Sequence, residues 1–145
     1  MYTMMQVCRE LDMTYQTLKY YCNEGLVPNV KRDNNNRRVF DERDVKWIKD
    51  LTCLKRCSMS IQEMKEYLDL CLQGESTIPQ RKELLKKKRA ALQESIKELE
   101  DSVAYIDWKQ NFYDEVLAGE RLYISNLIQT GTPEGSENPD DLEDE

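Results

Sequence analysis

Residues 14–28 read Thr14-Tyr15-Gln16-Thr17-Leu18-Lys19-Tyr20-Tyr21-Cys22-Asn23-Glu24-Gly25-Leu26-Val27-Pro28, and this stretch decides the fold. It carries the start and stop signals of a short helix. The Thr14 hydroxyl can accept an otherwise unpaired backbone N–H at the N-terminus, and Gly25 can adopt the left-handed conformation that ends a helix. Pro28 then prevents the helix from resuming. Leu18 and Tyr21 are expected to face inward, which leaves an outward face of Tyr15, Gln16, Lys19 and Tyr20.

The outward face of this helix combines one cation, one amide and two phenols, which suits the phosphates and base edges of a nucleic-acid groove. A solvated surface helix can have the same composition, so the preceding residues are needed to decide. Thr3 and Gln6 form a capping box for a helix over residues 1–12, and Asp12-Met13 is a brief turn. Two short helices joined this tightly predict a helix-turn-helix motif whose second helix is the recognition element.

The segment after Pro28 is polar and basic. Residues 29–36 are rich in Asn, which tolerates turns, and the following Arg-Arg-Val-Phe reads as a short strand. Val30 and Val39 are expected to pair across the loop as a two-stranded wing. A solvated basic loop is the alternative, but the adjacent helix-turn-helix favours a wing that contacts phosphates. Its cations are Lys31, Arg32, Arg37 and Arg38.

Two more helices are expected between the wing and Gly74. Asp41 can cap the first, which runs to about Arg56 and carries Val45, Ile48, Leu51 and Leu54 at three-residue steps, with Trp47 adding bulk. Ser60 and Glu63 form a capping box for the second. Its inward residues are expected to be Ile61, Met64, Tyr67, Leu68, Cys71 and Leu72.

A long helix is expected to begin at Pro79, where the missing N–H of proline costs nothing. Apolar residues recur along it in a heptad pattern, and at 1.5 Å per residue the helix would be about 60 Å long. Nothing else in the chain is long enough to cover this stripe, so the pattern favours a coiled coil with a second copy. A helix folded back on its own domain is the alternative. The expected dimerisation residues are Leu85, Leu92, Ile96, Leu99, Val103, Ile106, Tyr113 and Leu117.

The expected domain organisation follows from these elements. Residues 1–74 form a DNA-binding domain with its helix pair, and residues 75–119 form the dimerisation helix. Residues 120–130 are a short amphipathic segment that we expect to pack on the dimer. Residues 131–145 contain seven acidic residues and no cation, which predicts a disordered tail.

Charge is unevenly distributed along the chain of 145 residues. The formal net charge is −7, yet residues 1–60 hold 11 Lys and Arg against 8 Asp and Glu. A locally basic surface can meet phosphates whatever charge the remainder carries. No apolar run is long enough to span a membrane and no signal peptide opens the chain. We therefore expect a cytoplasmic protein without membrane contact.

The residue types argue against enzymatic chemistry. The sequence has five cysteines and no histidine, so it lacks the commonest general base and the commonest metal ligand. It also has no CxxC pair and no phosphate-binding Gly loop. We expect no catalytic residue, no metal site and no cofactor, and we expect reduced thiols. Cys8, Cys22 and Cys71 are predicted to be packing residues, with Cys22 the most exposed of the three.

The motif Thr17-Leu18-Lys19-Tyr20-Tyr21, followed by Gly25-Leu26-Val27-Pro28 and Arg38-Val39-Phe40, resembles the MerR family of bacterial transcription regulators. The resemblance extends from residue 2 to about residue 118. It implies a mainly α fold, in which a winged helix-turn-helix domain precedes a long antiparallel coiled-coil dimerisation helix. The chain departs from the family pattern at five positions. The family has Arg at Lys19, Asp at Cys22 and Gly at Asn36. It has Tyr at Arg37 and Gly at Ser58.

The resemblance also implies a mode of action. A homodimer would place two recognition helices in successive major grooves, and an inducer would make it bend and untwist promoter DNA for RNA polymerase. The expected partners are therefore double-stranded promoter DNA, a second copy of the chain and RNA polymerase at the promoter. The residues expected to contact DNA are Thr14, Tyr15, Gln16, Lys19, Tyr20, Lys31, Arg32, Arg37, Arg38 and Arg56.

Cys53 is the candidate sensor residue. Within the family, residues 53–65 and 74–78, together with Arg81, are similar to a branch that responds to aldehydes and thiol stress and carries one cysteine at the place of Cys53. The neighbouring cations Lys49, Lys55 and Arg56 could favour a reactive thiolate. A small buried cysteine is the alternative. For the whole chain, the alternative function is a coiled-coil adaptor that uses its helix-turn-helix only for packing.

Overall fold

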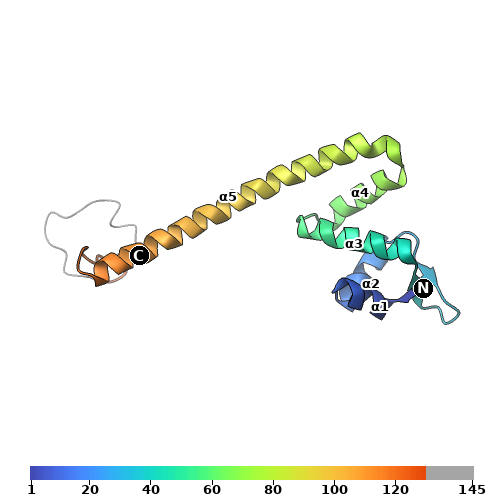
Figure 1. Ribbon diagram of the computed structural model, residues 1–145, viewed down its shortest axis with the longest axis horizontal. Helices are drawn as coiled ribbons and strands as arrows, with labels where there is room; N and C mark the ends of the chain where they lie inside the picture. The colour runs from blue at the N-terminus through green and yellow to red at the C-terminus, as the bar shows by residue number, and fades with distance from the viewer. Residues whose placement is uncertain (130–145) are drawn as a thin grey trace. The chain divides into compact units, whose positions relative to one another are not determined.

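The computed structural model describes residues 1–129 (Figure 1). The described chain divides into two compact units, Met1–Gln93 and the part that begins at Glu94. The mainly helical class, with a winged helix-turn-helix and a long C-terminal helix, is confirmed. The predicted disordered tail over residues 131–145 lies outside the described residues. The elements are β1 (Tyr2–Thr3), α1 (Met4–Leu11), α2 (Tyr15–Asn23), β2 (Lys31–Arg32), β3 (Arg38–Phe40), α3 (Glu42–Arg56), α4 (Ile61–Leu72), the short 3₁₀ helix η1 (Glu75–Thr77) and α5 (Ile78–Leu117).

The helix-turn-helix begins and ends at the predicted signals. The Thr3 hydroxyl accepts the backbone N–H of Gln6 at 3.2 Å, and the Gln6 side chain accepts the backbone N–H of Thr3 at 2.8 Å. Thr14 caps α2 by accepting the backbone N–H of Thr17 at 3.1 Å. Gly25 has φ 75°, a left-handed conformation that is favourable for glycine because it has no Cβ, and it ends α2. These local signals explain why both helices are short.

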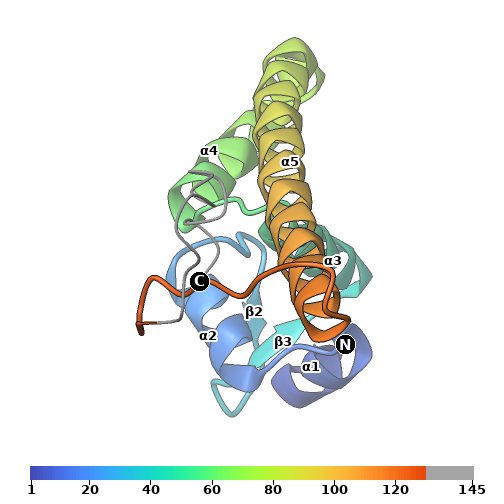
Figure 2. The ribbon, with the colours of Figure 1, turned by 90° about the vertical axis from the view of Figure 1, so that its left-hand side faces the viewer.

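Strands β2 and β3 of the wing lie side by side (Figure 2). They belong to a three-stranded antiparallel sheet in the order β1-β3-β2. Strand β1 was not predicted, because two residues are too few to show an alternating pattern. The predicted pairing of Val30 with Val39 is wrong by one residue, since Val39 pairs with Lys31. A slip of one residue exchanges the two faces of a strand. Phe40, at the end of the central strand, is 0% exposed and anchors the sheet in the core.

Helices α3 and α4 close the core of the first unit. The indole N–H of Trp47 in α3 donates to the carbonyl of Leu26 at 2.6 Å, and its ring stacks on Tyr67 of α4 with centroids 6.5 Å apart. Leu72 does not face inward as predicted: it is the last residue of α4 and is 62% exposed. The predicted inward residues that are fully or nearly buried are Val45, Ile48, Leu51, Leu54, Met64 and Leu68.

The turn between α4 and α5 is held by Arg81. Its Nε donates to the Thr77 hydroxyl at 3.0 Å, and its Nη2 donates to the carbonyl of Gly74. Pro79 lies in the first turn of α5, as predicted. Along α5, Leu92 and Tyr113 are half-buried. The other predicted dimerisation residues are exposed: Leu85, Ile96, Leu99, Val103, Ile106 and Leu117.

In the second unit, residues 120–129 form no regular helix and fold back on the end of α5. The guanidinium of Arg121 lies 5.2 Å from the ring centroid of Phe112, and its Nε is 3.2 Å from the carboxylate of Glu115. Phe112 and Ile124 are both buried. The segment that we expected to pack on a dimer therefore packs on its own helix, because Phe112 offers it an apolar and cation-binding surface.

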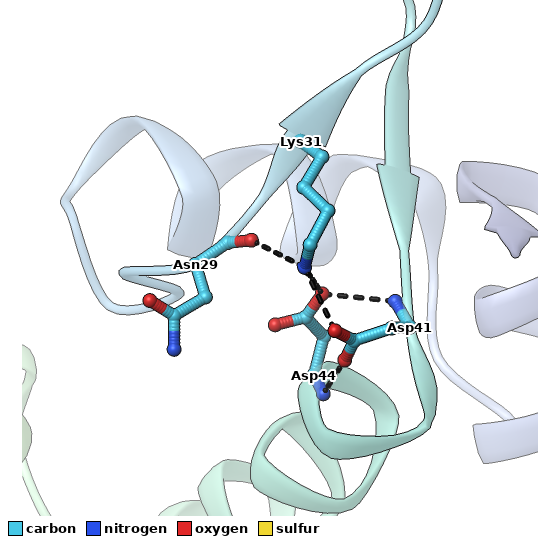
Figure 3. Close-up of polar contacts among 4 residues, drawn as sticks. All are labelled: Asn29, Lys31, Asp41 and Asp44. Carbon is cyan, nitrogen blue, oxygen red and sulfur yellow. Dashed lines mark hydrogen bonds and ion pairs between the residues drawn. The ribbon is translucent and has the colours of Figure 1, made fainter.

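Lys31 joins the wing to the start of α3 (Figure 3). Its Nζ donates to the carbonyl of Asn29 at 2.9 Å and to the carboxylates of Asp41 and Asp44 at 2.9 and 3.1 Å. The same carboxylates form a reciprocal capping box, in which each accepts the other's backbone N–H at 2.9 Å. The hydrogen bond from Lys31, followed by that from the Asp44 backbone, lowers the pKa of Asp41 to about 2. The hydrogen bonds to Asp41 and Asp44 in turn raise the pKa of Lys31.

Asp41 should make the stability of the fold depend on acid pH. Its folded pKa of about 2 lies below the value of about 3.9 for an unfolded aspartate, so its stabilisation is present above about pH 4 and is lost as the pH falls toward 2. We expect Asp41→Asn, which keeps a capping side chain, to flatten the decline in melting temperature between about pH 4 and pH 2. Circular dichroism melts measure this effect.

The matched control is Asp50→Asn, because Asp50 is exposed on the same helix. Equal pH dependence for the wild type and Asp41→Asn would contradict the assignment.

Candidate nucleic-acid interface

Helix α2 presents its predicted polar face to solvent. Tyr15 and Tyr20 are 46% and 48% exposed, and Leu18 and Tyr21 on the opposite face are buried. Thr14 is held at the N-terminus, since its hydroxyl lies 2.7 Å from that of Thr17 in addition to accepting its N–H. The face that remains for a duplex therefore has the predicted composition, with Gln16 and Lys19 also exposed.

The wing loop is a fixed turn. One carboxylate oxygen of Asp33 accepts the backbone N–H groups of both Asn35 and Arg37 at 2.9 Å. Asn36 takes the left-handed conformation with φ 60°, and its carbonyl accepts a hydrogen bond from Arg32 Nη1 at 2.9 Å. A loop ordered in this way holds its cations at set positions before any ligand binds, which reduces the entropy lost on binding.

The predicted cations differ in how they are engaged. Lys31 is bound to three acceptors of its own chain, so we assign it to holding the wing. Arg38 Nη2 donates to the side-chain oxygen of Asn23 at 2.6 Å. Arg37 is exposed on the wing, and Arg56 is exposed in the last turn of α3. The wing thus presents arginines, which bind phosphates in a fork geometry, and uses its lysine internally.

A groove of about 510 Å³ lies between the N-terminal end of α1, the start of α2 and the wing. Tyr15 of α2 lines it, together with Met5 at the start of α1. Its charged lining comprises the guanidinium groups of Arg32, Arg37 and Arg38 and one carboxylate, from Asp33. This excess of two positive charges beside an exposed helix face is suited to a sugar-phosphate backbone.

The cysteines are all free thiols in the described structure. Cys53 is exposed, so the alternative of a buried cysteine is wrong for this residue. Cys8 is buried, and Cys22 and Cys71 are half-buried, so the prediction that Cys22 is the most exposed of these three is not borne out. Burial raises the pKa of the Cys22 thiol, against the opposing effect of the nearby Arg38.

Within residues 1–129, no cluster of three or more His, Cys, Asp or Glu side chains is arranged to hold a metal ion. In the same residues, no helix has the length and apolar character needed to cross a membrane.

Two residues that shape the interface were not predicted. Asp33 organises the wing turn, and its position before an Asn-rich loop is a signal for such a turn that could have found it. Asn23 carries no local signal, because its partner Arg38 is 15 residues away and only the tertiary fold brings the two together.

The comparisons with known proteins agree on one family. A model described as MerR HTH family regulatory protein matches residues 2–71, and one described as MerR, DNA binding matches residues 45–108. An HTH-type transcriptional regulator of Haemophilus influenzae is 30% identical over 128 residues, covering 88% of this chain and 95% of the relative. The HTH-type transcriptional regulator AdhR of Bacillus subtilis is 38% identical over 87 residues, covering 60% and 62%.

A solved structure extends this similarity to three dimensions. It is the crystal structure of HiNmlR, a MerR family regulator lacking the sensor domain, bound to promoter DNA. Its TM-score is 0.68 at 31% identity, and the match covers 81% of this chain and 93% of that chain.

Arg37 and Lys31 should respond differently to substitution by alanine. Arg37→Ala should weaken binding to all duplexes alike and reduce the slope of log K against log salt by about 1, because one phosphate contact is lost. Lys31→Ala should mainly lower the melting temperature, since Asp41 and Asp44 lose their shared cation. Fluorescence anisotropy at several salt concentrations, with separate melts, measures both effects. An unchanged salt slope for Arg37→Ala would rule out its phosphate contact.

Proposed function

The chain belongs to the MerR family of helix-turn-helix transcriptional regulators, and from this premise we propose how it acts. It binds promoter DNA as a homodimer and changes transcription by bending and untwisting the duplex. The observation that carries this proposal is the presence, in one chain, of an exposed recognition face and an uncovered apolar stripe along α5.

The apolar stripe of α5 supports a coiled-coil dimer. Leu99 is 66% exposed and Ile106 is 56% exposed, although both occupy heptad positions that are buried in coiled coils. Full burial of one such side chain would stabilise the protein by about 1.5–3 kcal/mol relative to leaving it in water. A second copy offers the same stripe, so an isologous interface would cover both.

The charges of α5 favour an antiparallel dimer. Residues 78–93 hold six cations and one carboxylate, whereas residues 94–117 hold seven carboxylates and two cations. In an antiparallel pair the basic half of each helix lies beside the acidic half of the other. In a parallel pair like charges would face each other, which is destabilising.

A two-fold dimer gives the recognition helices a defined task. Each α2 would enter a major groove, with half-sites one helical turn apart, and each wing would contact the flanking backbone. Gln16 is the residue most suited to a base edge, because an amide can pair bidentately with adenine. Bending a promoter costs about 1–6 kcal/mol, which additional phosphate contacts can offset. The altered promoter would then be used by RNA polymerase.

Cys53 supports a response to electrophiles. The thiol is exposed on α3, four residues from the half-buried Cys57. Exposure is what attack by an aldehyde or another electrophile requires. We propose that modification of Cys53 changes the regulator's output at the promoter. The alternative, a coiled-coil protein adaptor, is not favoured, since a similar regulator is bound to promoter DNA.

Footprinting and sedimentation test the dimer on DNA. We expect the wild type to protect a near-palindromic site in the promoter of its own or a neighbouring gene, with a steep salt dependence. Leu99→Glu should produce monomers that no longer protect this site at concentrations saturating for the wild type, because it buries a charge in the apolar stripe of the dimer. Ala104→Glu is the control, since Ala104 is exposed on α5 outside the apolar stripe. A dimer that survives Leu99→Glu would contradict the proposed interface.

The sensor proposal is tested by transcription from the same promoter. We expect added aldehyde to change transcript levels with the wild type and to have no effect with Cys53→Ser, because serine has no comparable nucleophile. Cys57→Ser should keep the response, since its thiol is less accessible. An aldehyde response that persists in Cys53→Ser would remove the sensor role and leave the regulator intact.

A further inference from the structure

A hydrogen bond connects the end of the recognition helix to the wing. Asn23 is the last residue of α2, and its side-chain oxygen accepts a hydrogen bond from Arg38 Nη2 at 2.6 Å. Arg38 is the first residue of β3 and is half-buried. The bond therefore fixes an arginine of the basic groove relative to the helix that reads the duplex.

Two groups of α2 interact with Arg38, and both are uncharged. Asn23 is a neutral amide, and the raised pKa of Cys22 keeps its thiol protonated at neutral pH. The carboxylate of Asp33 lines the same groove, but one of its oxygens is bound to two backbone N–H groups of the wing turn. A carboxylate in place of the amide would also orient Arg38, yet it would cancel the charge that attracts a phosphate.

We propose that Asn23 is a positioning residue for DNA binding, which orients the guanidinium of Arg38 and leaves its whole charge available to a phosphate. The proposal rests on the proposed function, because it takes the backbone of promoter DNA as the partner of Arg38. A guanidinium has five N–H donors, so one hydrogen bond to Asn23 leaves the others for a phosphate. Holding the side chain in place reduces the rotamer entropy lost when DNA binds.

Two substitutions of Asn23 separate orientation from charge. Asn23→Asp keeps an acceptor for Arg38 but neutralises the positive charge of the guanidinium. One fewer counterion should therefore be released when DNA binds. The salt slope should then fall by about 0.9, and affinity should fall about fivefold near 0.15 M salt. Asn23→Ala keeps the charge and loses the orientation, so affinity should fall about two- to fivefold with the salt slope unchanged.

Three controls accompany the measurement. Asn29→Asp adds the same charge at an exposed position, where the amide is turned away from the Lys31 ammonium (Figure 3). Its salt slope should stay close to that of the wild type. Arg38→Gln removes the guanidinium and should match the salt slope of Asn23→Asp. Thermal melts of each variant identify any loss of folding, because an acid at the C-terminus of α2 opposes the helix dipole.

The outcomes distinguish this proposal from the proposed function. If the wild type binds no specific duplex, the proposed function fails. If the wild type binds and Asn23→Asp keeps the wild-type salt slope, the positioning role is overturned while the regulator stands. Parallel losses of affinity and melting temperature in Asn23→Asp and Asn23→Ala, with equal salt slopes, would also overturn it, because they indicate a structural role alone.

Discussion

The contact of Lys31 with Asp41 and Asp44 is the constraint on which the winged domain depends. Asp41 follows the end of β3 directly and caps α3, so its side chain sets where the helix begins. Lys31 brings β2 to the same point. The neighbouring Phe40 is fully buried, which prevents the strand from sliding. The positions of the wing, of its turn and of the groove beside α2 follow from this arrangement.

Two cations of the wing show how the charge of an acceptor decides a cation's task. Lys31 is bound by two carboxylates, and such a cation has little attraction left for an external phosphate. Arg38 is bound by the amide of Asn23, which directs the guanidinium without reducing its charge. Both cations stand in the same basic run of sequence. Their different roles arise because the fold places different acceptors beside them.

The residues that follow α5 leave its apolar stripe uncovered. Residues 120–129 are too few to cover its length, and the guanidinium of Arg121 lies against Phe112, which does not belong to the apolar stripe. The residues of the apolar stripe, such as Leu99 and Val103, therefore remain exposed in the single chain. Together with the opposite charges of the two halves of α5, this exposure is what favours a second copy as the partner.

The sequence by itself determined the helices, because their signals are local. The caps at Thr3, Thr14 and Ser60 each depend on residues within three positions, and the heptads of α5 are visible as a period. The recognition face of α2 could be read for the same reason.

Only the tertiary structure decided the pairings between distant residues. Strand β1, the register of the wing, the engagement of Lys31 and the bond from Arg38 to Asn23 all join segments far apart in the chain. The exposure of Cys53 and the burial of Phe112 were decided in the same way, since each depends on which neighbours the fold supplies. Local periodicity carries no information about such contacts, because they are selected by packing and charge in three dimensions.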